Sequence, residues 1–201
     1  MFDAINTFEI GILDWIQKVL GSPFCDTFFT YVTKLGDKGY IWIAIGIILL
    51  IFKKTRKFGV LLFVALILET IICKGVLKFL FERVRPYDFV GGYDLLIPKL
   101  SSFSFPSGHT MSSVVSATVL TLCNKKYGFF AIPIAVLISF SRLYLYVHYP
   151  SDVIIAAILG IILGVLVYKI GIRVSIKIKP KNRKSYEPYS KGQYNKIRKH
   201  P

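Results

Sequence analysis

Apolar and polar positions along the chain form a pattern that predicts helices throughout. Long apolar runs are separated by short polar or basic stretches, and the runs cover residues 40–52, 58–81, 107–124, 128–146 and 153–170. A transmembrane α-helix needs about 20 mostly apolar residues. The first run is short, so we expect its helix to begin within the preceding turn at residues 36–39. The pattern therefore predicts an all-α, polytopic membrane helix bundle with about five transmembrane helices.

Residues 1–35 contain no uninterrupted apolar run. Apolar side chains recur there at helical spacing with charged residues between them, namely Phe2, Ile5, Phe8, Ile12, Trp15, Ile16 and Leu20. This spacing is typical of an amphipathic helix that lies in the membrane interface. A turn at residues 21–23 ends that helix, and a second short helix is expected over residues 24–35. Whether this N-terminal segment crosses the membrane stays open.

Composition and charge agree with a membrane protein. Of the 201 residues 54% are hydrophobic, and the mean hydropathy of +0.56 is high for a soluble domain. The net charge of +15 comes from 26 Lys and Arg against 11 Asp and Glu, and 17 of the 26 fall on one side of a five-span topology. By the positive-inside rule that side is cytoplasmic. It includes the basic tail, residues 173–201, which we expect to anchor near anionic lipid rather than to bind nucleic acid.

The three cysteines give no sign of a disulfide framework or a metal site. Cys25, Cys73 and Cys123 are isolated and lie in or beside apolar segments. Their number is odd and their spacing fits no metal-binding pattern, so core packing is the expected role of each.

Three short segments carry polar residues at the ends of the apolar runs. They extend from Lys78 to Pro86, from Pro106 to His109 and from Ser141 to Asp152. The five-span topology places all three at the membrane face opposite the basic clusters. Since that topology rests on hydropathy and basic charge, the meeting of the three segments is a separate indication of one site.

The residue types in these segments suit a phosphate group. Lys78, Arg85 and Arg142 supply positive charge, and the planar fork of arginine matches phosphate oxygens. Ser107 and the backbone N–H groups near Gly108 mark the start of a helix, whose N-terminus attracts anions. Together they predict a cradle that also stabilises charge developing on a phosphoryl group.

Two of the three histidines lie in the same segments. Asp152 follows His148 by four residues and can hold its imidazole in one tautomer, which makes His148 a candidate nucleophile. His109 lies beside the expected anion site, so it is a candidate proton donor to the leaving oxygen.

The patterns KxxxxxxRP, PSGH and SRxxxxxHxxxD, which these segments contain, resemble the three signature motifs of the type 2 phosphatidic acid phosphatase superfamily. All motif positions match. The resemblance implies that His148 is the nucleophile and forms a phosphohistidine, that Asp152 orients it and that His109 is the general acid. It also implies that no metal or cofactor is needed. The positions that the resemblance assigns to phosphate binding are Lys78, Arg85, Ser107, Gly108 and Arg142.

The expected function is that of an integral membrane lipid phosphatase, with a transmembrane phosphatase domain at residues 36–172. Undecaprenyl diphosphate is the favoured substrate, and phosphatidylglycerophosphate and phosphatidic acid are the alternatives. The site is expected on the extracellular or periplasmic face of the cell (inner or plasma) membrane. Two other functions are compatible with a phosphate-binding site of this kind, that of a vanadium haloperoxidase-like enzyme and that of a non-enzymatic binder of anionic lipid. The oligomeric state is not predicted.

Several residues near the motifs are given other roles. Arg83 is expected at the surface or against a lipid headgroup. Tyr144, Tyr146 and Tyr149 are expected to line a headgroup pocket or to belong to an aromatic belt at the membrane surface. Glu69, near the middle of the second apolar run, is expected to hydrogen-bond to a Ser or Thr of another helix.

Overall fold

A computed structural model describes residues 3–178 and shows the chain to be helical over that range, with no strand. The elements are α1 (Asp3–Leu20), α2 (Pro23–Gly36), the 3₁₀ turn η1 (Asp37–Gly39), α3 (Tyr40–Ile51), α4 (Arg56–Thr70), the π-helical turn η2 (Ile71–Leu77), α5 (Lys78–Phe81), α6 (Pro86–Val90), α7 (Gly108–Cys123), α8 (Lys125–Tyr144) and α9 (Pro150–Ile178).

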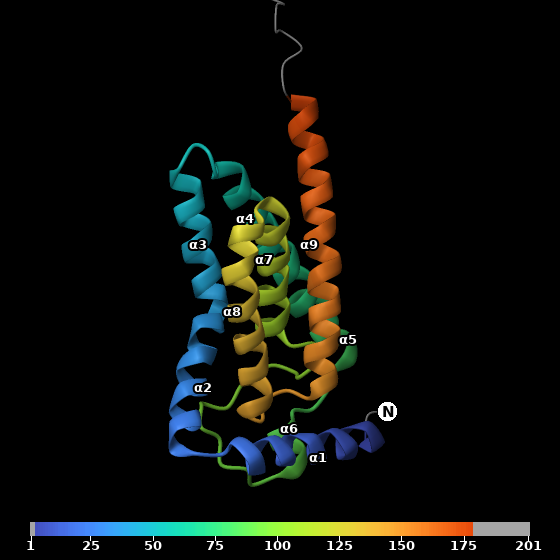
Figure 1. The fold of residues 1–201 in the computed structure, drawn as a ribbon. Helices are drawn as coiled ribbons and strands as arrows, with labels where there is room; N and C mark the ends of the chain where they lie inside the picture. Colours follow the sequence, from blue (N-terminus) through green and yellow to red (C-terminus); the bar gives the residue numbers. More distant parts are fainter. Residues whose placement is uncertain (1–2, 179–201) are drawn as a thin grey trace, which may run out of the picture. The chain divides into compact units, whose positions relative to one another are not determined.

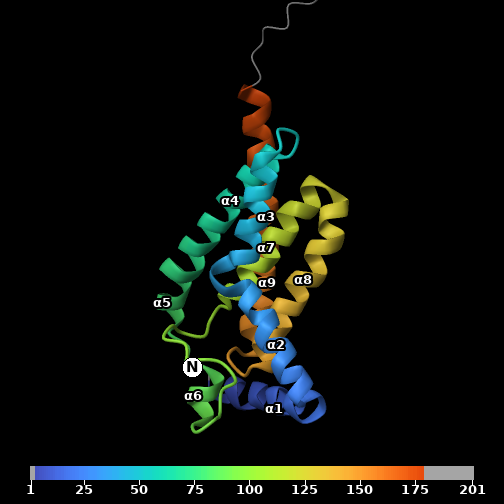
Figure 2. The same cartoon turned by 90° about the vertical axis from the view of Figure 1, so that its left-hand side faces the viewer.

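Helix α7 lies in the middle of the bundle, between α4, α8 and α9 (Figures 1 and 2). Small residues let its neighbours approach closely. A Cβ atom added at Gly164 of α9 would lie 2.8 Å from the Thr118 side chain, and one added at Gly128 of α8 would lie 2.3 Å from Thr121 Oγ1. Close backbone approach of this kind is usual where helices associate within a membrane.

Three helical segments of residues 3–178 are long and apolar enough to cross a membrane, by length and composition. They are Arg56–Val90, Lys125–Tyr144 and Pro150–Arg173. Helices α3 and α7, with 12 and 16 residues, are shorter than a hydrocarbon core of about 30 Å requires. The predicted bundle is thus helical with several apolar spans, whereas five spans remain a prediction.

The turn η1 explains why α3 is short. Lys38 and Gly39 both have left-handed backbone angles, with φ of 50° and 75°, so the chain breaks there and α3 begins at Tyr40. A left-handed φ is costly for lysine, which carries a Cβ atom. The break places Asp37 at the surface of a cavity that is described below.

Helix α1 crosses one end of the bundle, at the end where α8 leads into α9 (Figures 1 and 2). Its outer face is apolar, with Phe8 and Trp15 exposed by 72% and 62%. Its inner face contains Leu13 and Ile16, and also two polar residues, Asn6 and Glu9, all of them buried. An outward apolar face suits contact with lipid, and the buried polar residues require partners inside the protein.

The three tyrosines near the end of α8 are core residues, so both roles expected of them are wrong. Tyr144, Tyr146 and Tyr149 are at most 1% exposed. The first two donate hydrogen bonds to carboxylates of α2 and α1. Such long-range partners have no signal in the local sequence.

The predicted basic tail is described only up to residue 178, as the end of α9, and residues 179–201 lie outside the described range.

Candidate active site

Segments far apart in the sequence enclose one cavity of about 920 Å³. Six of the eight predicted site residues line it, namely Lys78, Arg85, Gly108, His109, Arg142 and His148. The other two, Ser107 and Asp152, are fully buried, and Ser107 N donates to the backbone oxygen of Asp152 at 3.2 Å. The structure therefore brings all eight residues into one place.

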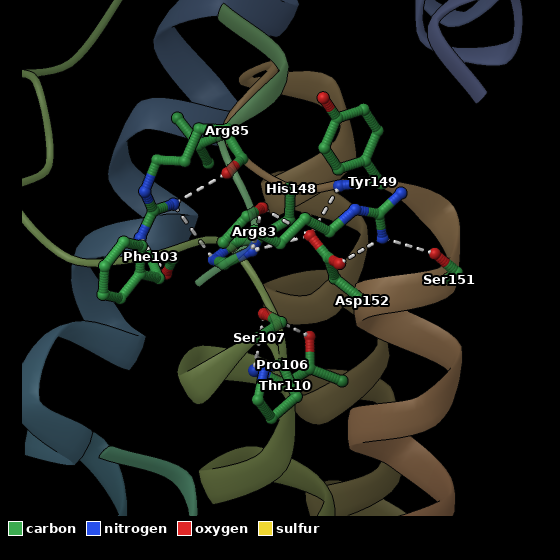
Figure 3. Close-up of polar contacts among 12 residues, drawn as sticks. Arg83, Arg85, Phe103, Pro106, Ser107, Thr110, His148, Tyr149, Ser151 and Asp152 are labelled. Carbon is green, nitrogen blue, oxygen red and sulfur yellow. Dashed lines mark hydrogen bonds and ion pairs between the residues drawn. The ribbon is translucent and has the colours of Figure 1, made fainter. Parts of the chain in front are cut away.

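Asp152 lies in the first turn of α9 and is fully buried (Figure 3). Its Oδ2 lies 3.4 Å from Nδ1 of His148 and accepts hydrogen bonds from Ser104 Oγ at 2.5 Å and Tyr149 N at 3.0 Å. Its Oδ1 accepts a hydrogen bond from Nη1 of Arg83 at 2.6 Å. These partners fix the carboxylate in one orientation and satisfy its buried charge.

His148 lies between this carboxylate and a guanidinium. Nη1 of Arg85 is 3.4 Å from Nε2 of His148 and donates to the Val147 carbonyl at 2.7 Å. Burial lowers the pKa of His148 well below its usual range, and the charge of Arg85 lowers that pKa further. A neutral imidazole with its proton on Nδ1, toward Asp152, leaves a lone pair on Nε2, where Arg85 lies. We assign this tautomer from the partners of the two nitrogens.

Arg142, at the end of α8, has unused hydrogen-bonding capacity. It is 1% exposed, and its Nη1 donates to Thr33 Oγ1 of α2. Its Nε and Nη2 are buried and have no hydrogen-bond partner among residues 3–178. An unpaired buried donor costs about 1–3 kcal/mol, more when it is charged. Because Arg142 lines the cavity, an anion bound there would satisfy these donors.

Lys78 also lines the cavity and is buried. Its Nζ donates to the carbonyl oxygen of Phe103, and Arg85 Nη2 donates to the same oxygen at 3.2 Å. The backbone of residues 102–103 thus holds two cations side by side. Like charges this close favour an anion between or beside them.

The start of α7 forms as the sequence predicts. Ser107 is the N-cap, and its Oγ accepts from Thr110 N at 3.4 Å and from Thr110 Oγ1 at 3.0 Å. Gly108 and His109 follow as the first residues of the helix and line the cavity. The positive end of the α7 dipole is therefore directed at the space between the three cations.

His109 has a partner that the sequence did not indicate. Its Nε2 lies 2.9 Å from Oδ1 of Asp37 in the turn η1. A carboxylate at this distance favours the protonated form of the imidazole. Helix α2 packs closely here, since a Cβ atom added at Gly36 would lie 2.7 Å from Cδ2 of His109.

Two more functional candidates were missed or misplaced by the sequence. Arg83 is 2% exposed and bonded to Asp152, so the expectation of a surface or headgroup contact is wrong. Ser104 is fully buried against the same carboxylate and belongs to none of the three predicted motifs. Glu69 also lines the cavity. Its Oε2 accepts a hydrogen bond from Thr70 of the same helix, whereas a Ser or Thr of another helix was expected as its partner.

The described part of the chain contains no group of three or more His, Cys, Asp or Glu side chains arranged to hold a metal ion.

Comparison with known proteins gives one consistent family. Residues 58–174 match the PAP2 superfamily. The undecaprenyl-diphosphatase of Sulfolobus acidocaldarius is 38% identical over 161 residues, which cover 80% of this chain and 71% of that protein. Phosphatidylglycerophosphatase B of Bacillus subtilis is 32% identical over 163 residues, covering 74% of this chain and 76% of that protein.

Solved structures share the fold. Aquifex aeolicus LpxE aligns with a TM-score of 0.70 and 35% identity, over 79% of this chain and 93% of that one. A transmembrane PAP2-type phosphatidylglycerolphosphate phosphatase from Bacillus subtilis has a TM-score of 0.66 and 29% identity, over 89% and 90%. A bacterial vanadium-dependent iodoperoxidase has a TM-score of 0.65 at 17% identity, over 84% of this chain and 50% of that one, and shares the fold alone.

Proposed function

Because this chain belongs to the PAP2 superfamily and is a phosphatase, we propose that it removes the terminal phosphate of a lipid diphosphate at a membrane surface. One observation carries the proposal. The imidazole of His148 lies between Asp152, at 3.4 Å from Nδ1, and Arg85, at 3.4 Å from Nε2. A ring held in this way presents a nucleophilic nitrogen to whatever anion the guanidinium binds.

The first chemical step forms a phosphohistidine. Arg85, Lys78 and Arg142 bind the non-bridging oxygens of the terminal phosphate, together with Ser107 and the N–H groups that begin with Gly108. Nε2 of His148 attacks the phosphorus, so an N–P bond forms as the P–O bond to the lipid breaks. His109 donates a proton to the oxygen that leaves with the lipid.

The second step regenerates the enzyme. Water attacks the phosphorus of the phosphohistidine while His109, now neutral, accepts a proton from it. The N–P bond breaks, and inorganic phosphate leaves. Three cations and a helix N-terminus supply the charge stabilisation that both steps need, and we therefore propose that the reaction requires no metal.

The names of two relatives favour an isoprenoid diphosphate as the substrate. The relative from Sulfolobus acidocaldarius is named an undecaprenyl-diphosphatase, as is BcrC of Bacillus subtilis, which is 29% identical over 147 residues. The cavity is also lined by apolar side chains, including Phe63, Leu66 and Ile67 of α4, which suits the tail of a lipid substrate. Phosphatidylglycerophosphate is the second candidate, because phosphatidylglycerophosphatase B is a relative of similar coverage.

The proposed topology has five spans, with α2, η1 and α3 together forming the first and α7 the third. The turn after α3 contains Lys53 and Lys54, and Lys125 and Lys126 are the first residues of α8. The α3–α4 and α7–α8 connections both lie at the end of the bundle away from α1 (Figure 1). By the positive-inside rule that end is cytoplasmic, and the site faces the extracellular or periplasmic side. Helix α1 then lies in the outer interface, whereas α2, which makes up the rest of the N-terminal segment 1–35, belongs to the first span.

Phosphate release from purified protein in detergent tests the proposal. We expect release from undecaprenyl diphosphate at a higher kcat/KM than from phosphatidylglycerophosphate or phosphatidic acid. Folded protein that releases phosphate from none of the three would contradict the proposal. Binding without release would favour an anionic-lipid binder, and vanadate-dependent bromide oxidation would favour a haloperoxidase-like enzyme.

A further inference from the structure

Helix α1 supplies a buried carboxylate to the immediate surroundings of the nucleophile. Glu9 is 5% exposed, and its Oε2 lies 2.6 Å from Nη2 of Arg83. Arg83 in turn donates through Nη1 to Oδ1 of Asp152 at 2.6 Å. One guanidinium therefore joins a carboxylate of α1 to the carboxylate that holds His148. Figure 3 shows the contact between Arg83 and Asp152.

Arg83 is fixed on several sides. Asn6 Oδ1 accepts hydrogen bonds from Nε at 3.0 Å and from Nη2 at 2.6 Å. The guanidinium carbon lies 3.9 Å from the centre of the Tyr149 ring. A planar group held by two side chains of α1 and by an aromatic face has little freedom to rotate, so the position of α1 fixes the direction from which Arg83 meets Asp152.

Glu9 also binds directly to the start of α9. Its Oε1 accepts from Ser151 N at 2.6 Å and its Oε2 from Ser151 Oγ at 2.9 Å. Ser151 immediately precedes Asp152, and its N–H is one of the first free donors of α9. The same carboxylate thus holds the backbone next to Asp152 and, through Arg83, the side chain of Asp152.

Two further contacts join α1 to the loop that contains His148. Gln17 Nε2 donates to the carbonyl of Tyr144, and Tyr146 Oη donates to Asp14 at 2.7 Å. Tyr146 has a φ of 58°, an unfavourable left-handed conformation for a residue with a side chain. Polar contacts from α1 therefore reach the loop before His148 and the helix start after it.

We propose that α1 is a positioning element for catalysis, which acts through Glu9 and Arg83 on Asp152 and so on the orientation of the His148 ring. The inference rests on the proposed function, because it assigns a role in the attack by His148. Glu9 and Asn6 lie outside residues 58–174, the part of the chain that matches the superfamily. Neither residue contacts the substrate in this account, so both are positioning residues.

A double-mutant cycle separates positioning from general stability. A misplacement of about 1 Å in a reacting group can cost about 100-fold in rate. We therefore expect Glu9→Ala to lower kcat by about 100-fold with a KM near that of the wild type. In an Asp152→Asn background, where the oriented imidazole is already lost, Glu9→Ala should lower kcat little further. Lys18→Gln, on the exposed side of α1, is the matched control and should keep the wild-type kcat.

Glu9→Gln keeps the size of the side chain and one acceptor oxygen, so its kcat should lie between those of the wild type and Glu9→Ala. It also provides a measurement if Glu9→Ala does not fold. A wild-type kcat in both Glu9 variants would overturn the proposal. So would an equal loss from Glu9→Ala in the two backgrounds, since a purely structural role acts regardless of Asp152.

A spectroscopic readout tests the inference without any lipid substrate. In protein labelled with ¹⁵N-histidine, the signals of His148 report which ring nitrogen carries the proton. We expect the Nδ1–H tautomer in the wild type and in Lys18→Gln, and a shift toward the Nε2–H tautomer in Glu9→Ala. An unchanged tautomer in Glu9→Ala would overturn the inference. If the wild type hydrolyses no lipid yet shows the predicted shift, the proposed function fails and the positioning role stands.

Discussion

Nε2 of His109 lies 2.9 Å from Oδ1 of Asp37, although the two residues are 72 positions apart in the sequence. The contact gives the proposed general acid a carboxylate partner of its own. Two carboxylates therefore serve the two histidines, with Asp152 beside His148 and Asp37 beside His109. The pairs differ in exposure, because the side chain of Asp152 is fully buried and that of Asp37 is 49% exposed.

Asp37→Asn should slow the step in which His109 donates its proton. The carboxylate of Asp37 lies 2.9 Å from Nε2 of His109, and a carboxylate at this distance favours the protonated imidazole. General acid catalysis contributes about 10²–10⁴-fold, so a partial loss of the acid should lower kcat by about 10-fold or more. Because less His109 is then protonated at a given pH, the alkaline limb of the kcat profile should move to lower pH. An unchanged profile would exclude this role for Asp37.

Arg142→Lys should weaken phosphate binding more than it disturbs the fold. Lysine keeps the positive charge but cannot replace the planar fork, whose Nε and Nη2 have no partner within residues 3–178. Hydrogen bonds to charged groups contribute about 1.5–3 kcal/mol, so the inhibition constant of inorganic phosphate or vanadate should rise by at least about 10-fold. Lys126→Gln, an exposed lysine at the other end of the bundle, serves as the control. Equal inhibition constants in wild type and Arg142→Lys would contradict the phosphate-binding role.

His148 should remain neutral in mildly acidic solution. Burial and the neighbouring Arg85 hold its pKa well below the usual value, so at about pH 6 its ring should still be neutral, whereas an unperturbed imidazole with a pKa of about 6.5 is mostly protonated. Titration of the ¹⁵N-histidine signals in the wild type, with His148→Ala to assign them, measures this directly. A midpoint near pH 6.5 for His148 would show that the site is more open to water than the structure indicates.

The sequence predicts the parts of the site that lie in short, local patterns. The helix start at Ser107, the i, i+4 pair of His148 and Asp152, and the three cations follow from residue type and spacing, and the structure brings them together. The carboxylate partner of His109 and the residues that hold Asp152 in place do not follow in this way. Asp37, Glu9 and Arg83 reach the site through tertiary contacts, for which a single sequence carries no local signal.

Features of the fold that depend on tertiary contacts were likewise not predicted from the sequence. Apolar runs predicted the helical bundle, but not the left-handed backbone at Lys38 that ends α2 and starts a short α3. The prediction for Arg83 was wrong because a basic residue beside a membrane edge is usually exposed, whereas its buried partners on α1 and α9 stabilise it inside the protein. Buried charge of this kind depends on pairing, which hydropathy alone does not reveal.

Transfer of labelled phosphate to His148 tests the central claim most directly. Undecaprenyl diphosphate carrying ³²P in its terminal phosphate is mixed with the enzyme, and the reaction is stopped within one turnover. The wild type should carry label that is stable in alkali and lost in acid, as expected of a phosphohistidine, and Lys126→Gln should behave likewise. His148→Ala should carry none and should release no phosphate. Label on His148→Ala, or rapid phosphate release by a wild type that is never labelled, would contradict the assignment of His148 as the nucleophile.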